Sequence, residues 1–364
     1  MKQVIEEVPV QTAVSNTDVR KSNLAGWLTG LVLLVFLMVL WGGLVRLTGS
    51  GLSIPEWPLI NGSLLPPIST QDWQAVYDSF HAELANLNQF SEPEKISLSR
   101  FKQMFAIEYI HRTLAAVIGI MFLIILVKGF RHKLTRQQVK WHLAFSGILL
   151  LSQAILGGVV VKNELQASLV ALHLGAAFLF FGLLLWTALY LSRLDSDTIN
   201  PTTRGLKRIG WIAVAAIFIQ VLLGGLTAGT HAGLIFNTFP KMGDFLVPPL
   251  AILFSPFYGN LFENLLKNQI LIQFLHRWWA FVALLCVAAV IFKGTKFNLS
   301  GRGRLALQLV GTVTVFQVLL GILNLLLKVP VWTSLVHLGT ALLIFGLTLV
   351  ILHDSKYGTA LKAV

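Results

Sequence analysis

The sequence predicts an all-α integral membrane protein of eight transmembrane helices, built as two tandem four-helix bundles. Three observations predict this class: an apolar composition, eight long apolar runs, and motifs of the first half that recur in the second. Of 364 residues, 55% are hydrophobic and 12% are charged, and the mean hydropathy is +0.74. A water-soluble domain of this length needs far fewer apolar residues. The composition therefore favours a chain embedded in lipid.

Eight apolar runs are long enough to cross the hydrocarbon layer, which takes about 20 helical residues at about 1.5 Å each. They are Leu24–Val45, Met104–Val127, Trp141–Val161, Leu169–Leu191, Ile209–Ala228, Ile270–Phe292, Leu305–Leu327 and Val331–Leu352. A further apolar stretch, Phe245–Leu261, contains three prolines, which break helices. We expect this stretch to lie in the membrane interface or to fold over the mouth of the bundle.

The distribution of basic residues predicts the direction of the spans. Alternate loops carry 18 Lys and Arg on the side of the N-terminus and 8 on the other side. Because cytoplasmic loops are enriched in Lys and Arg, both termini are expected in the cytoplasm. The same loops account for the net charge of +12, so we expect no nucleic-acid partner. The acidic residues Glu6, Glu7 and Asp18 argue against a presequence or signal peptide and favour a bacterial inner membrane.

Motifs of the first half recur in the second at constant offsets. The glycines and prolines between 42 and 67 recur without gaps at an offset of 182, so that Gly42-Gly43-Leu44 becomes Gly224-Gly225-Leu226. His111-Arg112 recurs at an offset of 165, and His173-Leu174-Gly175 recurs at an offset of 164. The difference of 17 residues predicts extra outer loop within 73–99. Because each unit has an even number of spans, the halves are expected to be related by a pseudo-twofold axis along the membrane normal.

These boundaries predict five segments. Residues 1–23 form a cytoplasmic tail, 24–191 the N-terminal bundle, 192–208 a cytoplasmic linker, 209–352 the C-terminal bundle and 353–364 a second cytoplasmic tail. The two longest segments between spans, 46–103 and 229–269, then form a cap on the outer side.

Four histidines lie inside spans, roughly one to two turns from the outer ends: His111, His173, His276 and His337. Neutral imidazole binds iron, and two histidines on facing helices can hold a heme from both sides. The repeat pairs His111 with His173 and His276 with His337. Any one of them alone reads best as a hydrogen-bonded core histidine, but four at repeated offsets and one depth favour heme ligation. The single cysteine, Cys286, permits no intrachain disulfide or cysteine-based metal site.

Charged residues beside these histidines break the repeat. Glu108 precedes His111 by three residues and shares its helix face, whereas Gln273 stands before His276 and cannot exchange a proton. The half with the carboxylate is the candidate reaction site, through acid/base catalysis or charge stabilisation, and the other half is a binding or electron-relay site. The alternative is that Glu108 only forms a packing salt bridge with Arg112.

The arginines that directly follow His111 and His276 can be interpreted in two ways. Arg112 and Arg277 stand where a heme propionate would emerge, and a guanidinium suits carboxylates; alternatively, Arg112 simply pairs with Glu108. Arg46 is either a further propionate contact or a residue that snorkels to the interface, and we expect the second. The remaining histidines are not predicted as ligands, although His231 stands near the cap, where it could touch a heme edge. They are His81, His132, His142, His231 and His353.

Five segments resemble the heme A synthase family of bacteria and mitochondria, in a branch without outer-loop cysteine pairs. They are Gly42–Thr48 with Ser50–Ser53, Glu108–Arg112, Asn237–Met242, and the two His-Leu-Gly segments. The resemblance covers essentially residues 24–352. It implies oxidation of the C8 methyl group of heme O to the formyl group of heme A, for terminal oxidases.

The resemblance also implies a role for each half. His276 and His337 would hold a heme b cofactor, while Glu108, His111 and His173 would line the heme O site. Heme O synthase and terminal oxidase assembly factors are the implied partners, and the apolar helix faces permit a homo-oligomer. Two other functions remain open: a diheme b-type electron-transfer protein, whose halves need not differ at residue 108, and a tandem-repeat transporter.

Overall fold

The computed structural model describes residues 16–54, 60, 62–63, 65–87, 96–131, 136–192, 203–356 and 359–360. Eight of its helices are long and apolar enough to cross a membrane, and each matches one predicted span, with Leu327 the one predicted residue that lies beyond its helix. The eight-span prediction is confirmed for this part of the chain. The helices are α1 (Asn16–Leu47), α3 (Leu98–Arg131), α4 (Gln137–Lys162), α5 (Ala167–Leu191), α6 (Arg204–Gly229), α9 (Gln269–Gly294), α10 (Gly301–Leu326) and α11 (Val331–Asp354).

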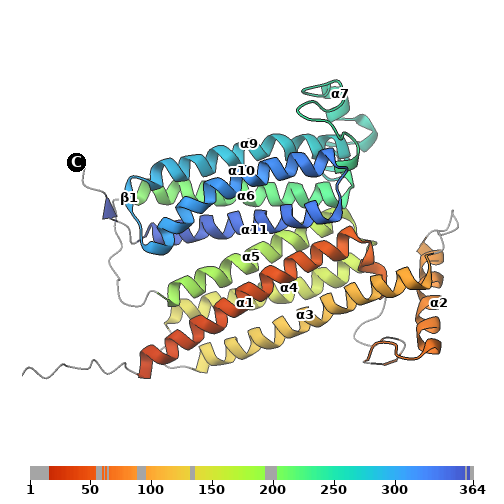
Figure 1. Cartoon of the computed structure of the whole chain (residues 1–364), viewed down its shortest axis with the longest axis horizontal. Coiled ribbons are helices and arrows are strands. Elements are labelled where there is room, and N and C mark those ends of the chain that lie inside the picture. The colour runs from red at the N-terminus through yellow and green to blue at the C-terminus, as the bar shows by residue number, and fades with distance from the viewer. Residues whose placement is uncertain are drawn as a thin grey trace, which may run out of the picture.

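The helices form two groups that follow the predicted halves (Figure 1). In the first group α1 contacts α3 and α5, and α4 contacts α5; in the second, α6 contacts α9 and α11, and α10 contacts α11. The groups meet where α5 packs against α6 and α11, and where α1 packs against α11. The hydrophobic core runs through this central layer, with side chains such as Phe178 and Leu342 fully buried.

The repeat extends to the backbone. The bounds of α4 and α10 differ by 164 residues at both ends. Glu164 and Leu165 adopt positive φ angles before α5, and Lys328 and Val329 adopt them before α11, again 164 residues later. Two short 3₁₀ helices, η1 (Ser50–Leu52) and η3 (Ala232–Leu234), are 182 residues apart. The sequence offsets therefore mark a structural duplication.

Contacts between the halves are reciprocal. Gly175 of α5 faces Leu222 of α6, and their repeat equivalents, Gly339 of α11 and Leu40 of α1, face each other as well. The absence of a side chain lets these helices approach closely. Reciprocal pairs are what a twofold relation produces, so they support the predicted pseudo-twofold axis, which itself stays a prediction.

One end of the bundle carries the segments that are predicted to lie on the outer side (Figure 1). The helix α2 (Thr70–Leu87) lies across this end, where Val76 and Phe80 pack with Phe101 and Phe105 of α3. This helix contains part of the region, residues 73–99, in which the first half is predicted to have 17 residues more than the second. The prediction that Phe245–Leu261 is not a span is confirmed, because the segment folds into short pieces. These are α7 (Leu250–Leu253), η4 (Pro256–Tyr258) and the start of α8 (Leu261–Lys267).

The opposite end holds the start of α1 and a short strand pair (Figure 1). The two-residue strands β1 (Phe297–Asn298) and β2 (Thr359–Ala360) pair antiparallel there. Asp354 ends α11 and accepts hydrogen bonds from the backbone N–H, at 2.9 Å, and the hydroxyl of Ser300, the N-cap of α10. Helix α1 begins at Asn16, inside the predicted tail. Most of the predicted tails and linker, and His132, lie outside the described residues.

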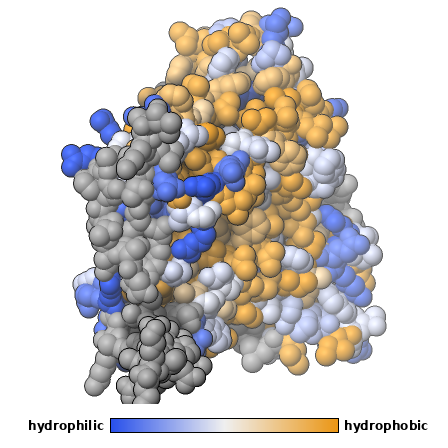
Figure 2. Space-filling view, turned by 60° about the vertical axis from the view of Figure 1, so that its left-hand side comes forward, coloured by the Kyte–Doolittle hydropathy of each residue, from blue (hydrophilic) through white to orange (hydrophobic). Residues whose placement is uncertain are grey.

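The outer faces of the long helices are apolar. Leu33 and Leu37 of α1, and Ile148, Leu151 and Ile155 of α4, are each more than half exposed. Figure 2 shows hydrophobic side chains over much of the visible face of the bundle. A soluble monomer rarely exposes so much contiguous apolar surface, so this surface matches a protein surrounded by lipid.

Candidate functional site

The structure brings the four embedded histidines together in the predicted pairs. The ring centroids of His276, on α9, and His337, on α11, are 6.5 Å apart, with an angle of 74° between the ring planes. In the other half, His111 of α3 and His173 of α5 lie close enough to interact electrostatically. Each pair joins helices that are not neighbours in sequence.

The spacing of the C-terminal pair suits an iron atom between the rings. A metal-bound imidazole nitrogen lies about 2 Å from its metal, and the ring centroid roughly 1.2 Å further away, so two rings on opposite sides of one iron have centroids roughly 6.4 Å apart. The observed 6.5 Å agrees with this geometry. Neutral imidazoles in an apolar bundle are also the ligands that heme iron takes.

Each histidine faces a glycine on the preceding long helix. A Cβ built on Gly42 would lie 3.2 Å from His111 Nε2, and one on Gly224 would lie 3.1 Å from His276 Cε1. The repeat places Gly157 against His173, at 3.6 Å, and Gly321 against His337, at 2.9 Å. The glycines thus leave room beside all four imidazoles, and the room is smallest in the C-terminal half.

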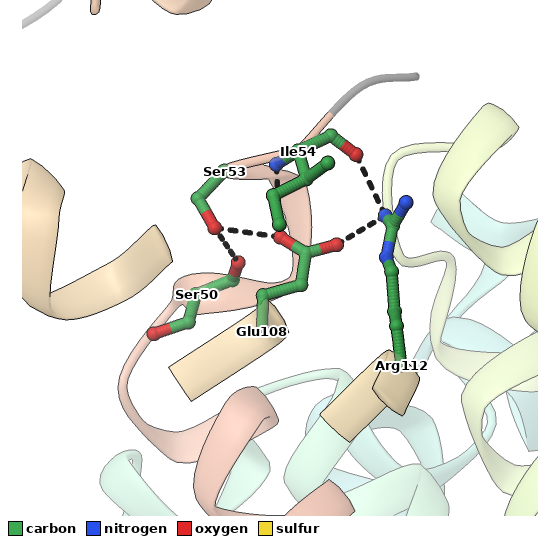
Figure 3. Close-up of polar contacts among 5 residues, drawn as sticks. All are labelled: Ser50, Ser53, Ile54, Glu108 and Arg112. Atoms are coloured by element: carbon green, nitrogen blue, oxygen red, sulfur yellow. Dashed lines mark hydrogen bonds and ion pairs between the residues drawn. The ribbon is translucent and has the colours of Figure 1, made fainter. Parts of the chain in front are cut away.

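Glu108 lies in a polar cluster in the first half of α3 (Figure 3). Its side chain is 2% exposed. Oε2 accepts a hydrogen bond from the Ser53 hydroxyl at 2.6 Å and another from the Ile54 backbone N–H at 3.0 Å. Oε1 forms an ion pair with Arg112, one helical turn further along. Three donors therefore fix both oxygens of a buried carboxylate on the helix that carries His111.

The C-terminal half repeats the arginine contact but not the carboxylate. Arg112 donates to the Ile54 carbonyl at 2.6 Å, and Arg277 donates to the equivalent Phe236 carbonyl, also at 2.6 Å. Gln273, in the place of Glu108, donates to that same carbonyl at 3.2 Å. Among the described residues its Oε1 has no hydrogen-bond partner. The two halves, which differ in sequence at Glu108 and Gln273, therefore also differ in the hydrogen bonds at this position.

Both predicted arginines contact protein groups. The contact that the alternative prediction requires, an ion pair between Arg112 and Glu108, is present. Arg277 lacks a carboxylate at the equivalent position and donates to the Thr238 carbonyl at 2.7 Å and the Lys241 carbonyl at 3.2 Å. A role for either arginine at a heme propionate stays a prediction.

Sequence reasoning missed a contact between the halves. Nη2 of Arg46, in the last turn of α1, lies 3.2 Å from the Ala228 carbonyl, 3.0 Å from the Gly229 carbonyl and 3.1 Å from His231 Nε2. His231 adopts φ 57°, and its repeat equivalent is Gly49 at φ 70°. Burial first, and then the Arg46 charge, lower the pKa of His231. Comparing residues at the 182 offset would have revealed a histidine in a glycine position.

Three glutamines that contact the histidines were also missed. Gln153 and Gln317 donate to the backbone carbonyls of His173, at 3.3 Å, and His337, at 3.0 Å. Gln220 lies 3.2 Å from His276 Nδ1. A glutamine inside an apolar span was the available signal. The other histidines that the structure describes inside helices pack against aromatic rings: His81 on Tyr77 and Phe80, His142 on Tyr190, and His353 on Trp186.

Comparisons with known proteins agree over the length of the chain. Residues 25–349 match the COX15-CtaA family, described as cytochrome oxidase assembly protein. The chain is 35% identical to a heme A synthase of Nitrosomonas eutropha, over 88% of this chain and 90% of the relative. It is 36% identical to a heme A synthase of Nitrosospira multiformis, over 96% and 99%, and 34% identical to one of Parvibaculum lavamentivorans, over 95% and 98%. The chain therefore belongs to the COX15-CtaA family of cytochrome oxidase assembly proteins.

Proposed function

We propose that this protein is a heme A synthase, which oxidises the C8 methyl group of heme O to the formyl group of heme A. The family, and relatives named heme A synthase that align over nearly the whole chain, support this activity. The observation that carries the proposal is the asymmetry at one repeated position. Glu108 is a buried carboxylate held by three donors beside one histidine pair, and the other pair has Gln273 instead. A diheme electron carrier gives no reason for this difference.

The N-terminal half is assigned to the substrate and the C-terminal half to a retained cofactor. Heme O would bind between His111 and His173, with Glu108 on the same face of α3. A heme b would bind between His276 and His337, whose spacing suits a bis-histidine iron. The bound heme b supplies one-electron chemistry. Arg112 and Arg277 lie one residue beyond a histidine, where they would stand near the propionates.

The protein's own groups position the substrate and manage charge. The methyl carbon would lose four electrons to an external oxidant in two two-electron steps. Each step would replace one C–H bond by a C–OH bond, with the oxygen taken from water or dioxygen, and the resulting gem-diol would lose water to leave the aldehyde. Glu108 would take up or release a proton, or stabilise positive charge developing at the carbon. Ser53 and Arg112 hold one carboxylate oxygen each, so they fix the group before the reaction begins. Preorganised charge of this kind is usually a large part of catalysis.

The setting of the enzyme follows from the distribution of charge and apolar surface. The protein would span a bacterial inner membrane with both termini in the cytoplasm, because the basic loops predict that direction. The glutamate cluster and α2 would then lie on the outer side. A heme O synthase that delivers the substrate and assembly factors that receive heme A are the partners. The apolar helix faces permit a homo-oligomer.

Pigment extraction after co-expression with a heme O synthase tests the function. The cells are expected to accumulate heme A, and the purified protein is expected to carry low-spin heme b. Heme B alone in the extract would favour an electron carrier, and purified protein without heme would favour a transporter. A Glu108→Gln protein serves as the matched control, because it keeps all four histidines.

A further inference from the structure

We propose that Gln220 is a positioning residue for the C-terminal heme, which holds the imidazole of His276 and makes that heme the retained one. The inference rests on the proposed function, because it assigns a heme to His276. Gln220 lies on α6, one turn before Gly224, which faces the same ring. Its amide nitrogen is 3.2 Å from His276 Nδ1 and 2.9 Å from the His276 backbone carbonyl.

The N-terminal half has no equivalent of this contact. At the offset of 182, the position of Gln220 is occupied by Met38, whose thioether is at best a weak acceptor. Within the described part of the chain, Nδ1 of His173 is buried without a partner, as is Nδ1 of His337 in the C-terminal half, so His276 Nδ1 is distinguished by its amide neighbour. The His276 ring thus has a glutamine amide at the position where the repeat offers His111 a methionine.

His337, the other histidine of the C-terminal pair, also has a glutamine amide beside its ring. Gln153 and Gln317 are repeat equivalents, and both donate to the carbonyl of a histidine. Gln317 also approaches His337 at 3.4 Å, at Nε2 and not at Nδ1, and its Oε1 accepts from the Thr340 hydroxyl. Alanine replaces Thr340 at the equivalent position 176 of the other half. Amide contacts to the imidazoles are therefore concentrated in the half assigned to the cofactor.

The chemistry of ligation explains what Gln220 would do. An imidazole that binds iron through one nitrogen carries a proton on the other, and this N–H needs an acceptor. Oε1 of Gln220 is buried without a hydrogen-bond partner among the described residues. A half-turn of the amide exchanges Nε2 with Oε1 and brings an acceptor to Nδ1, and it replaces the hydrogen bond that Nε2 donates to the His276 carbonyl at 2.9 Å. Such a partner fixes the ring and raises its basicity, which strengthens binding and stabilises the ferric state.

The proposed functions of the two halves require different heme affinities, and the amide contacts to the histidines differ in the same sense. A cofactor heme must stay bound through many turnovers, whereas heme O must enter and heme A must leave. Losing a partner of this kind typically costs about 10- to 100-fold in metal affinity. A methionine at position 38 thus suits a site that exchanges its heme, and a glutamine at position 220 suits a site that retains it.

Gln220→Met, which installs the residue of the other half, is the direct test. The measurements are the midpoint potential of the low-spin heme b and the rate of heme transfer from purified protein to apomyoglobin. We expect about 10- to 100-fold faster transfer and a higher potential. Gln220→Glu offers a stronger acceptor and should lower the potential below that of the unchanged protein. Gln153→Met is the matched control: among the described residues Gln153 hydrogen-bonds only to a backbone carbonyl, and its loss should leave the heme b potential unchanged.

An unchanged potential and transfer rate in Gln220→Met would overturn the assignment. If the Gln220→Met protein fails to accumulate, the Gln220→Glu protein provides the test. A midpoint potential of its heme b equal to that of the unchanged protein would contradict a hydrogen bond between residue 220 and His276. Heme A in the pigment extract is read separately. Its absence from cells with the unchanged protein would reject the proposed function, whereas its presence together with an unshifted heme b potential would reject only the role of Gln220.

Discussion

Glu108 and Gln273 occupy the same position of the repeat but make opposite hydrogen bonds. Glu108 accepts from Ser53 and from the Ile54 backbone, whereas Gln273 donates to the backbone carbonyl of Phe236, the equivalent of Ile54. One duplicated scaffold therefore holds a carboxylate in one half and an amide in the other. This difference gives the two halves different chemistry without a different fold.

Removing the hydroxyl that holds Glu108 should impair heme A formation. A hydrogen bond to a charged group contributes about 1.5–3 kcal/mol, so we expect Ser53→Ala to lower the heme A yield by about 10- to 100-fold. The measurement is the ratio of heme A to heme O in extracted pigment. Ser146→Ala, which removes a buried hydroxyl without a hydrogen-bond partner among the described residues, is the control. Equal heme A yields from the Ser53→Ala and Ser146→Ala proteins would show that the Ser53 hydroxyl does not contribute to heme A formation.

Filling the space beside a histidine should affect the halves unequally. The built Cβ of Gly321 lies 2.9 Å from His337, so Gly321→Ala must displace the ring, whereas the Cβ of Gly157 lies 3.6 Å from His173, an ordinary contact. We expect Gly321→Ala to shift the low-spin electron paramagnetic resonance spectrum of heme b and to reduce heme content. Gly157→Ala should leave that spectrum intact. The same spectrum for both variants would contradict the assignment of heme b to His337.

The contact between Arg46 and His231 should make stability depend on pH. Burial and the Arg46 charge lower the pKa of His231 in the folded protein, so the unfolded chain binds the proton more readily. Stability is then complete above about pH 6.5, the ordinary histidine pKa, and falls as the pH drops toward the folded value. His231→Gly removes this dependence and also suits the positive φ.

Thermal unfolding in detergent at pH 7.5 and pH 5.5 measures this effect. The unchanged protein should lose more stability between the two pH values than the His231→Gly protein does. His231→Asn is the control, because asparagine tolerates positive φ and does not titrate. Equal losses in all three proteins would show that His231 does not contribute to the pH dependence.

The segment from Phe245 to Phe262 should lie at the interface between lipid and water on the outer side of the inner membrane. It contains no charged residue, and Phe257 at its tip is 88% exposed. Aromatic side chains favour this depth of the bilayer. A Phe257→Trp protein in vesicles should therefore lose tryptophan fluorescence when the lipids carry bromine near the headgroup, relative to the unchanged protein. Absence of added quenching would place this segment in water.

The sequence was sufficient for the spans and the histidine pairs because both depend on strong, repeated signals. Each apolar run became a helix, and the duplicated offsets located equivalent residues such as His173 and His337. Contacts made by long polar side chains could not be read in this way. Arg46 reaches carbonyls 182 and 183 residues away, and Gln220 reaches a histidine on another helix. Such partners depend on how the helices pack, and only comparison of the two halves residue by residue would have singled them out.

Exchanging the glutamate and the glutamine tests the central claim most directly. Glu108→Gln and Gln273→Glu are made separately, and heme A, heme O and heme b are quantified in the purified proteins. Glu108→Gln is expected to retain heme b and bind heme O but to form little or no heme A, while Gln273→Glu keeps forming heme A. Normal heme A production by the Glu108→Gln protein would contradict the assignment of the reaction to the N-terminal half.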